Sequence, residues 1–189
     1  MKVIFLDIDG VLNSENHAKE MFALKDENPQ KFYNTWDLPY EGTLKPLQRI
    51  VESTGAVIVL SSTWRLRRIP LLNKVFKPYG FQIIDRTCYG VSLKKLQELG
   101  FDTDKCYDAQ YRDFKFNNSC NINTYDRGAE IMLWLSEHKD VESFVILDDD
   151  WLDIEPYYTK EHVQTDFYNW GLTEELADKA IKILNKEEM

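Results

Sequence analysis

The stretch that decides the fold is Val3-Ile-Phe-Leu-Asp7-Ile-Asp9-Gly10, close to the N-terminus. Residues 2–6 form a short apolar run, which is typical of a strand buried inside a parallel sheet. Similar runs predict four further strands, the last of them a short edge strand: 56–60, 81–84, 143–147 and 162–165. Helical patterns follow the predicted cap residues Thr43, Ser92, Asp126 and Thr173, and a further helix over 70–79 opens with Pro70 and stops at Gly80. This alternation predicts a three-layer, Rossmann-like α/β domain with a parallel central sheet.

Two stretches interrupt the alternation. Residues 13–42 show no clear helical or strand period, and residues 88–125 form a long link whose second half is rich in Asp, Asn and aromatic side chains. Segments of this length are usually functional lids or disordered loops, and their aromatic content argues against disorder. We therefore expect one domain over residues 1–189, with 13–42 as a short flap or cap and 88–125 as an insertion near the binding edge of the sheet.

Composition limits the classes of function. The chain has 189 residues and a formal net charge of −9, so it lacks the overall positive field of a nucleic-acid-binding protein, although a local basic groove stays compatible with it. No apolar run reaches the length of a membrane span, and the first residues do not form a signal-peptide core. The three cysteines lack zinc-ligand spacing and fit free thiols. We expect a soluble, cytoplasmic protein without a membrane partner.

Asp7 and Asp9 follow the first strand and, two residues apart in extended chain, point to the same side. Like charges this close repel each other unless a cation or a proton lies between them. Mg²⁺ would relieve the repulsion, because it binds one or two carboxylates together with phosphate oxygens. One carboxylate can then act as a nucleophile on phosphorus, and the other as a general acid and base. The alternative is a pair of solvated or capping acids in a turn.

Three further polar groups stand at predicted element ends. Ser61 and Ser62 follow the second strand and are candidates for binding phosphate oxygens. Asp148 and Asp149 follow the fourth strand and are candidate metal ligands, while Arg127 at a helix start could neutralise a phosphoryl group. Helix capping by the serines and a surface salt bridge by Arg127 are the alternatives. Because ligands of such folds bind at the carboxyl ends of the strands, we expect these side chains to meet.

In this order, the pieces resemble the motifs of the haloacid dehalogenase (HAD) superfamily of aspartate-nucleophile phosphatases. The strand with Asp-x-Asp-Gly lies at residues 5–12, and the Ser, the basic residue and the final acidic pair are matched by Ser61, Arg127 and Asp148-Asp149. The motifs Ser61-Ser-Thr-Trp-Arg65 and Arg127-Gly-Ala-Glu-Ile131 are similar to those of the phosphatase domains associated with Swiss Army knife RNA-repair proteins. Residues 88–125 look longer than the usual link of that subgroup.

The resemblance implies a role for each matched residue. Asp7 would be the nucleophile that forms an aspartyl-phosphate, and Asp9 would protonate the leaving group and then activate water. Ser61, with Ser62 beside it, and Arg127 would hold the phosphoryl group. Mg²⁺ would be bound by Asp7, Asp148, Asp149 and the backbone carbonyl of Asp9. The implied activity is Mg²⁺-dependent hydrolysis of phosphomonoesters.

The substrate stays open at this point. A nucleotide or nucleic-acid end phosphate is the first expectation, and a small-metabolite phosphate is the second. The basic run Arg65, Arg67 and Arg68 would provide a substrate contact through Arg65, or would be a solvated helix start. Residues 111–117 could stack a base or form the core of a small cap. From other classes, the alternatives are a signalling receiver with Asp85 as its phosphoacceptor and a phosphate-binding module without turnover.

Overall fold

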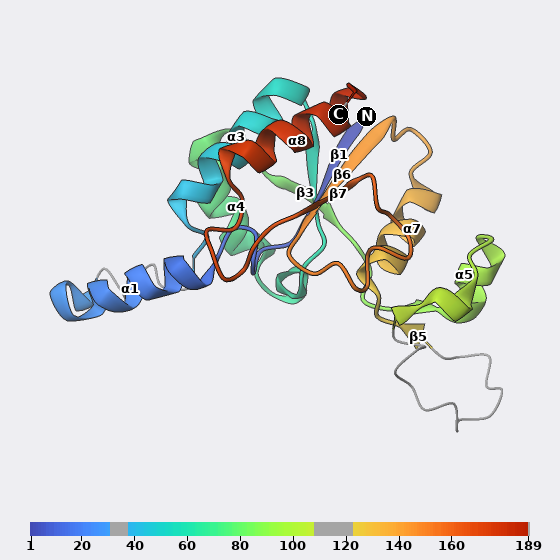
Figure 1. Cartoon of the computed structure of the whole chain (residues 1–189), viewed down its shortest axis with the longest axis horizontal. Coiled ribbons are helices and arrows are strands. Elements are labelled where there is room, and N and C mark those ends of the chain that lie inside the picture. The colour runs from blue at the N-terminus through green and yellow to red at the C-terminus, as the bar shows by residue number, and fades with distance from the viewer. Residues whose placement is uncertain (31–37, 108–122, 189) are drawn as a thin grey trace.

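A five-stranded parallel sheet forms the centre of this computed structural model, which describes residues 1–30, 38–107 and 123–188 (Figure 1). Its strands are β1 (Lys2–Leu6), β2 (Val57–Leu60), β3 (Ile83–Arg86), β6 (Ser143–Asp148) and β7 (His162–Gln164). They lie in the order β3-β2-β1-β6-β7, and every neighbouring pair runs parallel. The strand order reverses between β1 and β6, and such a switch point opens a ligand crevice at the carboxyl ends of the two strands.

Helices cover both faces of the sheet. α3 (Glu41–Thr54), α4 (Ile69–Phe76) and α8 (Glu174–Asn185) pack on one face, and α7 (Arg127–Glu137) packs on the other. β1 serves both layers, because successive side chains of a strand point to opposite faces. Ile4 and Leu6 join the core under α3 and α8, whereas Val3 and Phe5 join the core under α7. The predicted three-layer α/β fold with a parallel sheet is confirmed.

The strand order also bears on the receiver alternative. Receiver domains have a doubly wound sheet of the order 2-1-3-4-5, in which the third strand lies next to the first. Here β3 pairs with β2, and the second neighbour of β1 is β6. Counted along the chain, this order is 3-2-1-4-5, which is the Rossmann-type arrangement. The topology therefore argues against a receiver domain.

Two predicted helix caps are confirmed. The Ser92 hydroxyl accepts a hydrogen bond from the Lys95 N–H at the start of α5 (Leu93–Glu98). The Thr173 hydroxyl accepts from the Leu176 N–H at the start of α8. Each bond satisfies one of the N–H groups that a helix start leaves without an intrahelical partner.

Of the other two predicted caps, Thr43 is wrong, and Asp126 takes the N-cap position of α7 without a capping bond from its side chain. α3 begins at Glu41, so Thr43 lies inside the helix, and its hydroxyl donates to the Leu12 carbonyl at 2.9 Å. This bond ties the segment after β1 to α3. Asp126 does precede α7, but its carboxylate makes no capping bond and instead accepts a hydrogen bond from the Tyr157 hydroxyl at 2.9 Å. The Thr43 hydroxyl also has a local acceptor, the Tyr40 carbonyl at 2.8 Å.

Two element boundaries also differ from the prediction. β3 begins later than the predicted run 81–84, because it is an edge strand in which Ile83 is the one buried side chain. The predicted helix 70–79 is split into α4 and a 3₁₀ turn, η2 (Lys77–Tyr79), before Gly80 ends it with a φ of 81°. A second 3₁₀ turn, η1 (Thr63–Leu66), follows β2.

Residues Glu15–Glu27 form helix α1, which the sequence patterns did not predict. Ser14 caps it, and His17 is the one buried side chain among those described in the helix. With so little of its surface buried, α1 has no apolar stripe to reveal it. Figure 1 shows α1 projecting from the body of the molecule. Neither α1 nor any other described helix is both long and apolar enough to cross a membrane.

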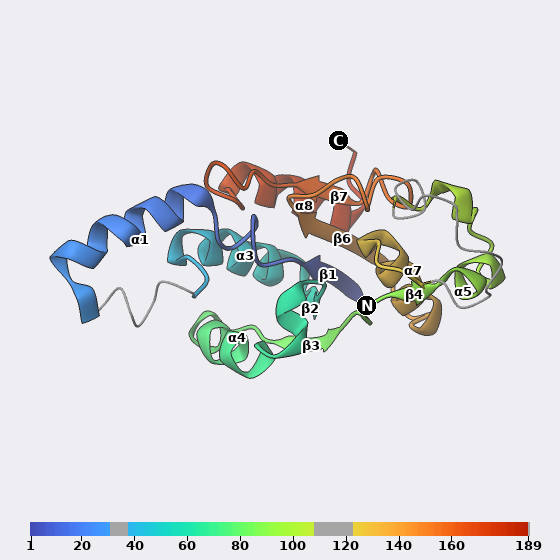
Figure 2. The same cartoon turned by 90° about the horizontal axis from the view of Figure 1, so that it is seen from below.

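The 88–125 stretch is closed at its base by a small antiparallel pair, β4 (Val91–Ser92) with β5 (Asn123–Thr124). Between them, the described part holds α5 and a 3₁₀ turn, η3 (Thr103–Lys105). This segment and α1 extend to opposite sides of the molecule (Figures 1 and 2). Cys88 is a free thiol, as predicted. Cys120 and the stretch 111–117 lie outside the described residues.

Candidate active site

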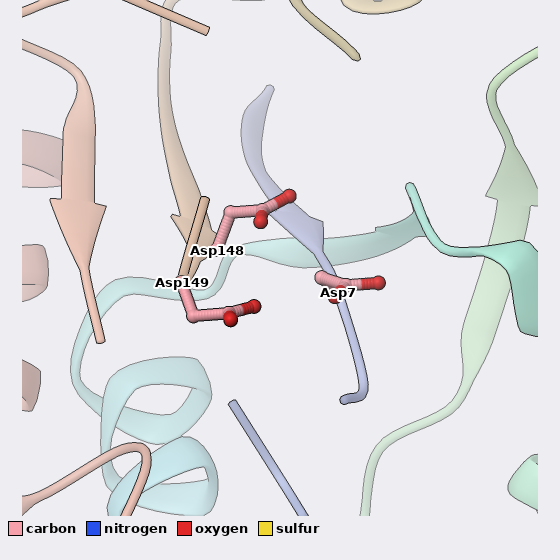
Figure 3. A group of neighbouring side chains, drawn as sticks. All are labelled: Asp7, Asp148 and Asp149. Atoms are coloured by element: carbon pink, nitrogen blue, oxygen red, sulfur yellow. The ribbon is translucent and has the colours of Figure 1, made fainter. Parts of the chain in front are cut away.

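Three carboxylates meet where β1 and β6 end (Figure 3). Asp7 follows β1, and its N–H donates to the Leu147 carbonyl at 3.0 Å, which fixes its backbone beside β6. Asp148 is the last residue of β6, and Asp149 follows it. One oxygen from each of these aspartates lies within 4.8 Å of the others, and the three side chains point to the same side. The fold thus brings together acids from two separate sequence motifs.

Burial raises the pKa of all three carboxyls. Desolvation is the largest cause for Asp7 and raises its pKa to about 6, although the nearby Arg127 charge opposes the rise. The pKa of Asp148, which is 2% exposed, is raised well above its ordinary value by burial and then by the Asp7 charge. Desolvation also raises the pKa of Asp149. Carboxylates this close, two of them almost fully buried, are costly unless a cation or a proton neutralises them.

Arg127, the first residue of α7, supplies positive charge to this cluster. Its Nη2 lies 4.0 Å from Asp7 Oδ1, and its Nε lies 3.5 Å from Asp148 Oδ2. Asp153 holds the helix start in place: its carboxylate accepts from the Arg127 N–H at 2.9 Å, and its carbonyl accepts from the Gly128 N–H at 3.0 Å. Asp153 was not predicted, because no sequence spacing connects the segment after β6 to the start of α7.

Ser61 and Ser62 are both buried beside the cluster, but their hydroxyls differ. The Ser61 N–H donates to the Leu6 carbonyl at 2.8 Å, while its Oγ has no hydrogen-bond partner among the described residues. Ser62 accepts from the Trp64 N–H at 3.4 Å, and its hydrogen bond to Asp7 lowers the pKa of that carboxyl. A buried hydroxyl without a partner is costly, so the Ser61 Oγ has the character of a ligand contact.

Asp9 stands on the turn that leaves β1. Gly10 has a φ of 80°, and its N–H donates to the Asn13 carbonyl at 2.7 Å. A Cβ at Gly10 would lie 2.2 Å from the Asp149 Cγ, so glycine is needed for the turn and for this close approach. The exposed Asp9 carboxylate accepts a hydrogen bond from the Trp64 indole N–H at 2.8 Å. This contact was missed, although Trp64 lies within the quoted Ser-Ser-x-Trp-Arg motif.

The comparison with known families agrees with this geometry. The family model described as "HAD domain in Swiss Army Knife RNA repair proteins" matches residues 3–177. The chain belongs to this family. The resemblance inferred from the motifs is therefore confirmed, and the HAD domain is a phosphatase-type hydrolase. No curated protein and no solved structure matches the chain.

The acidic cluster of this HAD domain has the donor chemistry for a hard divalent cation. Its three acids, Asp7, Asp148 and Asp149, offer oxygen atoms alone, which Mg²⁺ prefers over nitrogen or sulfur. The buried Asp148 Oδ2 has no hydrogen-bond partner among the described residues, and the Arg127 Nε lies 3.5 Å from it. Asp148 Oδ2 can therefore act as a metal ligand.

The basic run of the HAD domain is divided between buried and exposed positions. Arg65 is 3% exposed, and its Nη2 contacts the Glu130 carboxylate at 2.7 Å. Arg68 lies over the Trp64 ring, with its Cζ 4.6 Å from the ring centroid, and Arg67 is exposed. Arg65 is therefore not part of a solvated helix start. Because Arg65 is buried and paired with Glu130, we do not include it among the proposed substrate contacts.

Proposed function

We propose that this HAD domain is a Mg²⁺-dependent phosphomonoester hydrolase that works through a covalent aspartyl-phosphate on Asp7. The observation that carries the proposal is the setting of the Asp7 carboxylate. It lies 4.0 Å from the Arg127 guanidinium and within 4.8 Å of carboxylate oxygens of Asp148 and Asp149. A nucleophile beside a fixed cation and a candidate metal site suits attack on a charged phosphoryl group.

Mg²⁺ would be held by the carboxylates of Asp7, Asp148 and Asp149 and by the backbone carbonyl of Asp9. Bound there, it would supply positive charge that draws the anionic phosphate toward the acidic cluster and stabilises the charge that develops in transfer. The buried oxygen donors and the raised pKa values of the three carboxyls support this assignment.

Each step of the proposed phosphoryl transfer is carried out by residues of the chain. An Asp7 oxygen bonds to phosphorus while the bond from phosphorus to the ester oxygen breaks, and Asp9 gives its proton to that oxygen. Arg127 and the Ser61 hydroxyl hold the phosphoryl oxygens. Water then bonds to phosphorus, its proton passes to Asp9, and the bond from phosphorus to the Asp7 oxygen breaks. Asp7 is returned as a carboxylate and phosphate is released.

The substrate class that we propose is a nucleotide or nucleic-acid end phosphate. The family description, which names RNA-repair proteins, supports this choice over a small-metabolite phosphate. We also propose that residues 1–189 act as one domain, in which 13–42 serve as a flap and 88–125 as an insertion beside the site. The projection of α1 and α5 to opposite sides supports a site that is bordered by both segments (Figure 2).

A substrate panel with and without Mg²⁺ tests the proposal. It compares 3′- and 5′-phosphorylated oligonucleotides, mononucleotides and sugar phosphates by release of inorganic phosphate. We expect turnover only with Mg²⁺, and highest kcat/KM on nucleotides or oligonucleotide ends. Asp7→Asn should lower kcat by at least about 10³-fold, since it removes the nucleophile. Asp178→Asn, which changes an exposed acid paired with Arg49, is the matched control.

Two results would contradict different parts of the proposal. Full Mg²⁺-dependent turnover by Asp7→Asn would exclude the aspartyl-phosphate mechanism. A clear preference for sugar phosphates in the unmodified protein would leave that mechanism standing and replace the substrate class.

A further inference from the structure

Trp64 makes a contact that the proposed division of roles does not use. Its indole Nε1–H donates to Asp9 Oδ2 at 2.8 Å. Asp9 is exposed and stands on a turn, so its side chain would otherwise be free to rotate in solvent. A single directed donor therefore decides where this carboxyl group points.

The indole is itself held firmly. Trp64 belongs to η1, whose start is capped by the Ser62 hydroxyl at 3.4 Å from the Trp64 N. Its ring packs against the larger hydrophobic core on one side, and the Arg68 guanidinium lies over it at 4.6 Å. η1 follows directly after Ser61 and Ser62 at the end of β2. The indole donor is thus fixed near Ser61 at the end of β2, whereas Asp9 follows β1.

We propose that Trp64 is a positioning residue for proton transfer by Asp9, an inference that rests on the proposed function. The indole bond occupies Oδ2 and leaves Oδ1 to carry the proton. The Oδ1 proton passes to the ester oxygen as the bond to phosphorus breaks, so the leaving group departs as a neutral alcohol. In the second step, Oδ1 takes the proton of the water that bonds to phosphorus. Without the indole, the Asp9 carboxyl group loses the hydrogen bond that orients it.

This role predicts a dependence on the leaving group. An alkoxide, such as a ribose oxygen at a nucleic-acid end, is a strong base and needs the proton as it leaves. A nitrophenolate leaves readily without it. Disturbing the Asp9 orientation should therefore slow hydrolysis of alkyl phosphates far more than hydrolysis of nitrophenyl phosphate. A structural defect elsewhere would slow both to a similar extent.

Trp64→Phe, which keeps a ring but removes the donor, tests this inference with 2-phenylethyl phosphate and p-nitrophenyl phosphate. We expect kcat/KM to fall about tenfold or more on the alkyl ester and less than about threefold on the aryl ester. In an Asp9→Asn background the substitution should have no further effect on the alkyl ester. Trp134→Phe is the matched control, because the Trp134 indole N–H donates to Asp85 Oδ2 at 2.7 Å outside the site. It should leave the ratio of the two rates unchanged.

Equal losses on both esters, or the same loss in the Asp9→Asn background, would overturn the role of Trp64. No change on either ester would do the same. If Trp64→Phe does not fold, 3-benzothienylalanine at position 64 keeps the shape of the indole and lacks the N–H, and the same expectations apply to it. Absence of hydrolysis by the unmodified protein, or full activity of Asp7→Asn, would instead overturn the proposed function. The two failures are therefore distinguishable.

Discussion

Two adjacent serines show how single residues in the site are set for binding. Ser61 and Ser62 are almost fully buried, yet Ser62 bonds to Trp64 and Asp7 while the Ser61 Oγ has no partner among the described residues. Removing a buried, unpaired hydroxyl relieves a desolvation penalty. We predict that Ser61→Ala leaves the free energy of unfolding unchanged or raises it by up to about 1 kcal/mol, while kcat/KM falls about tenfold or more. Urea unfolding and phosphate release measure the two quantities.

Ser62→Ala is the internal comparison. It removes the cap of η1 and a hydrogen bond to Asp7, so the free energy of unfolding should fall by about 1 kcal/mol. Opposite changes in stability from neighbouring serines would assign the Ser61 hydroxyl to ligand binding. A loss of stability in Ser61→Ala as large as that in Ser62→Ala would contradict this assignment.

The residues that could be predicted are those whose position follows from the strand ends. Asp7, Asp148 and Ser61 each follow a buried apolar run, and parallel strands bring such positions to one edge of the sheet. Trp64 and Asp153 could not be assigned in this way. Their contacts join segments that are distant in sequence, and whether the atoms come within hydrogen-bond distance depends on the three-dimensional path of η1 and of the segment after β6.

At the scale of elements, a buried ion pair connects η1 to α7. Arg65 Nη2 contacts both Glu130 oxygens, at 2.9 and 2.7 Å, and the two side chains are 3% and 1% exposed. Glu130 also accepts from the Gly90 N–H at 2.8 Å. Because η1 carries Trp64 and α7 begins at Arg127, this pair sets the distance between two parts of the proposed site.

Glu130→Gln should break the pair without removing the oxygen that Gly90 needs. The Arg65 guanidinium would then be buried without its counter-charge, so we predict that the free energy of unfolding falls by about 3 kcal/mol. The double variant Arg65→Met with Glu130→Met should lose less than either single methionine variant, since it buries no lone charge. Urea unfolding of all four proteins checks both expectations. If the free energy of unfolding changed by less than about 0.5 kcal/mol, the pair would contribute no more to stability than an exposed salt bridge.

The predictability of an element depends on how much of it is buried. β1, β2 and β6 are almost continuously apolar because helices cover both faces, and their positions were predicted within a residue. α1 was missed because its described side chains contribute one buried residue, His17, and no apolar period. Ser14 followed by Glu15 was the available signal, since a cap and a first-turn acid mark a helix start. Thr43 does not cap α3 because the helix begins at Glu41, and the Thr43 hydroxyl donates to the Leu12 and Tyr40 carbonyls.

At the scale of the whole molecule, the fold concentrates negative charge at one edge of a sheet in a chain that is already acidic at −9. The order of strands makes this unavoidable, because the ends of β1 and β6 are neighbours. In the folded chain, the burial of these carboxyls therefore opposes their ionisation. The cost of ionising buried carboxyls links the stability of the protein to protons and to divalent cations.

The raised pKa values of buried carboxyls predict how stability changes with pH. Burial raises the pKa of Asp7 and Asp153 from 3.8 to about 6 in the folded chain. Between those values the folded state binds more protons than the unfolded state, so the contribution of these groups to stability falls as the pH rises through this window. Without metal, the melting temperature should therefore fall as the pH rises from about 4 to about 6.

Mg²⁺ should reverse that loss only where the site acids are ionised. It should raise the melting temperature by several degrees near pH 7.5 and very little near pH 4.5, with EDTA restoring the metal-free value. The variants Asp7→Asn and Asp153→Asn separate the effect of carboxyl ionisation from that of Mg²⁺ binding. Both remove a carboxyl whose pKa is raised, but only Asp7 is a proposed ligand. Both should flatten the metal-free pH dependence, while only Asp153→Asn should keep the response to Mg²⁺. An equal response to Mg²⁺ in Asp7→Asn would mean that the cation binds elsewhere on this acidic chain.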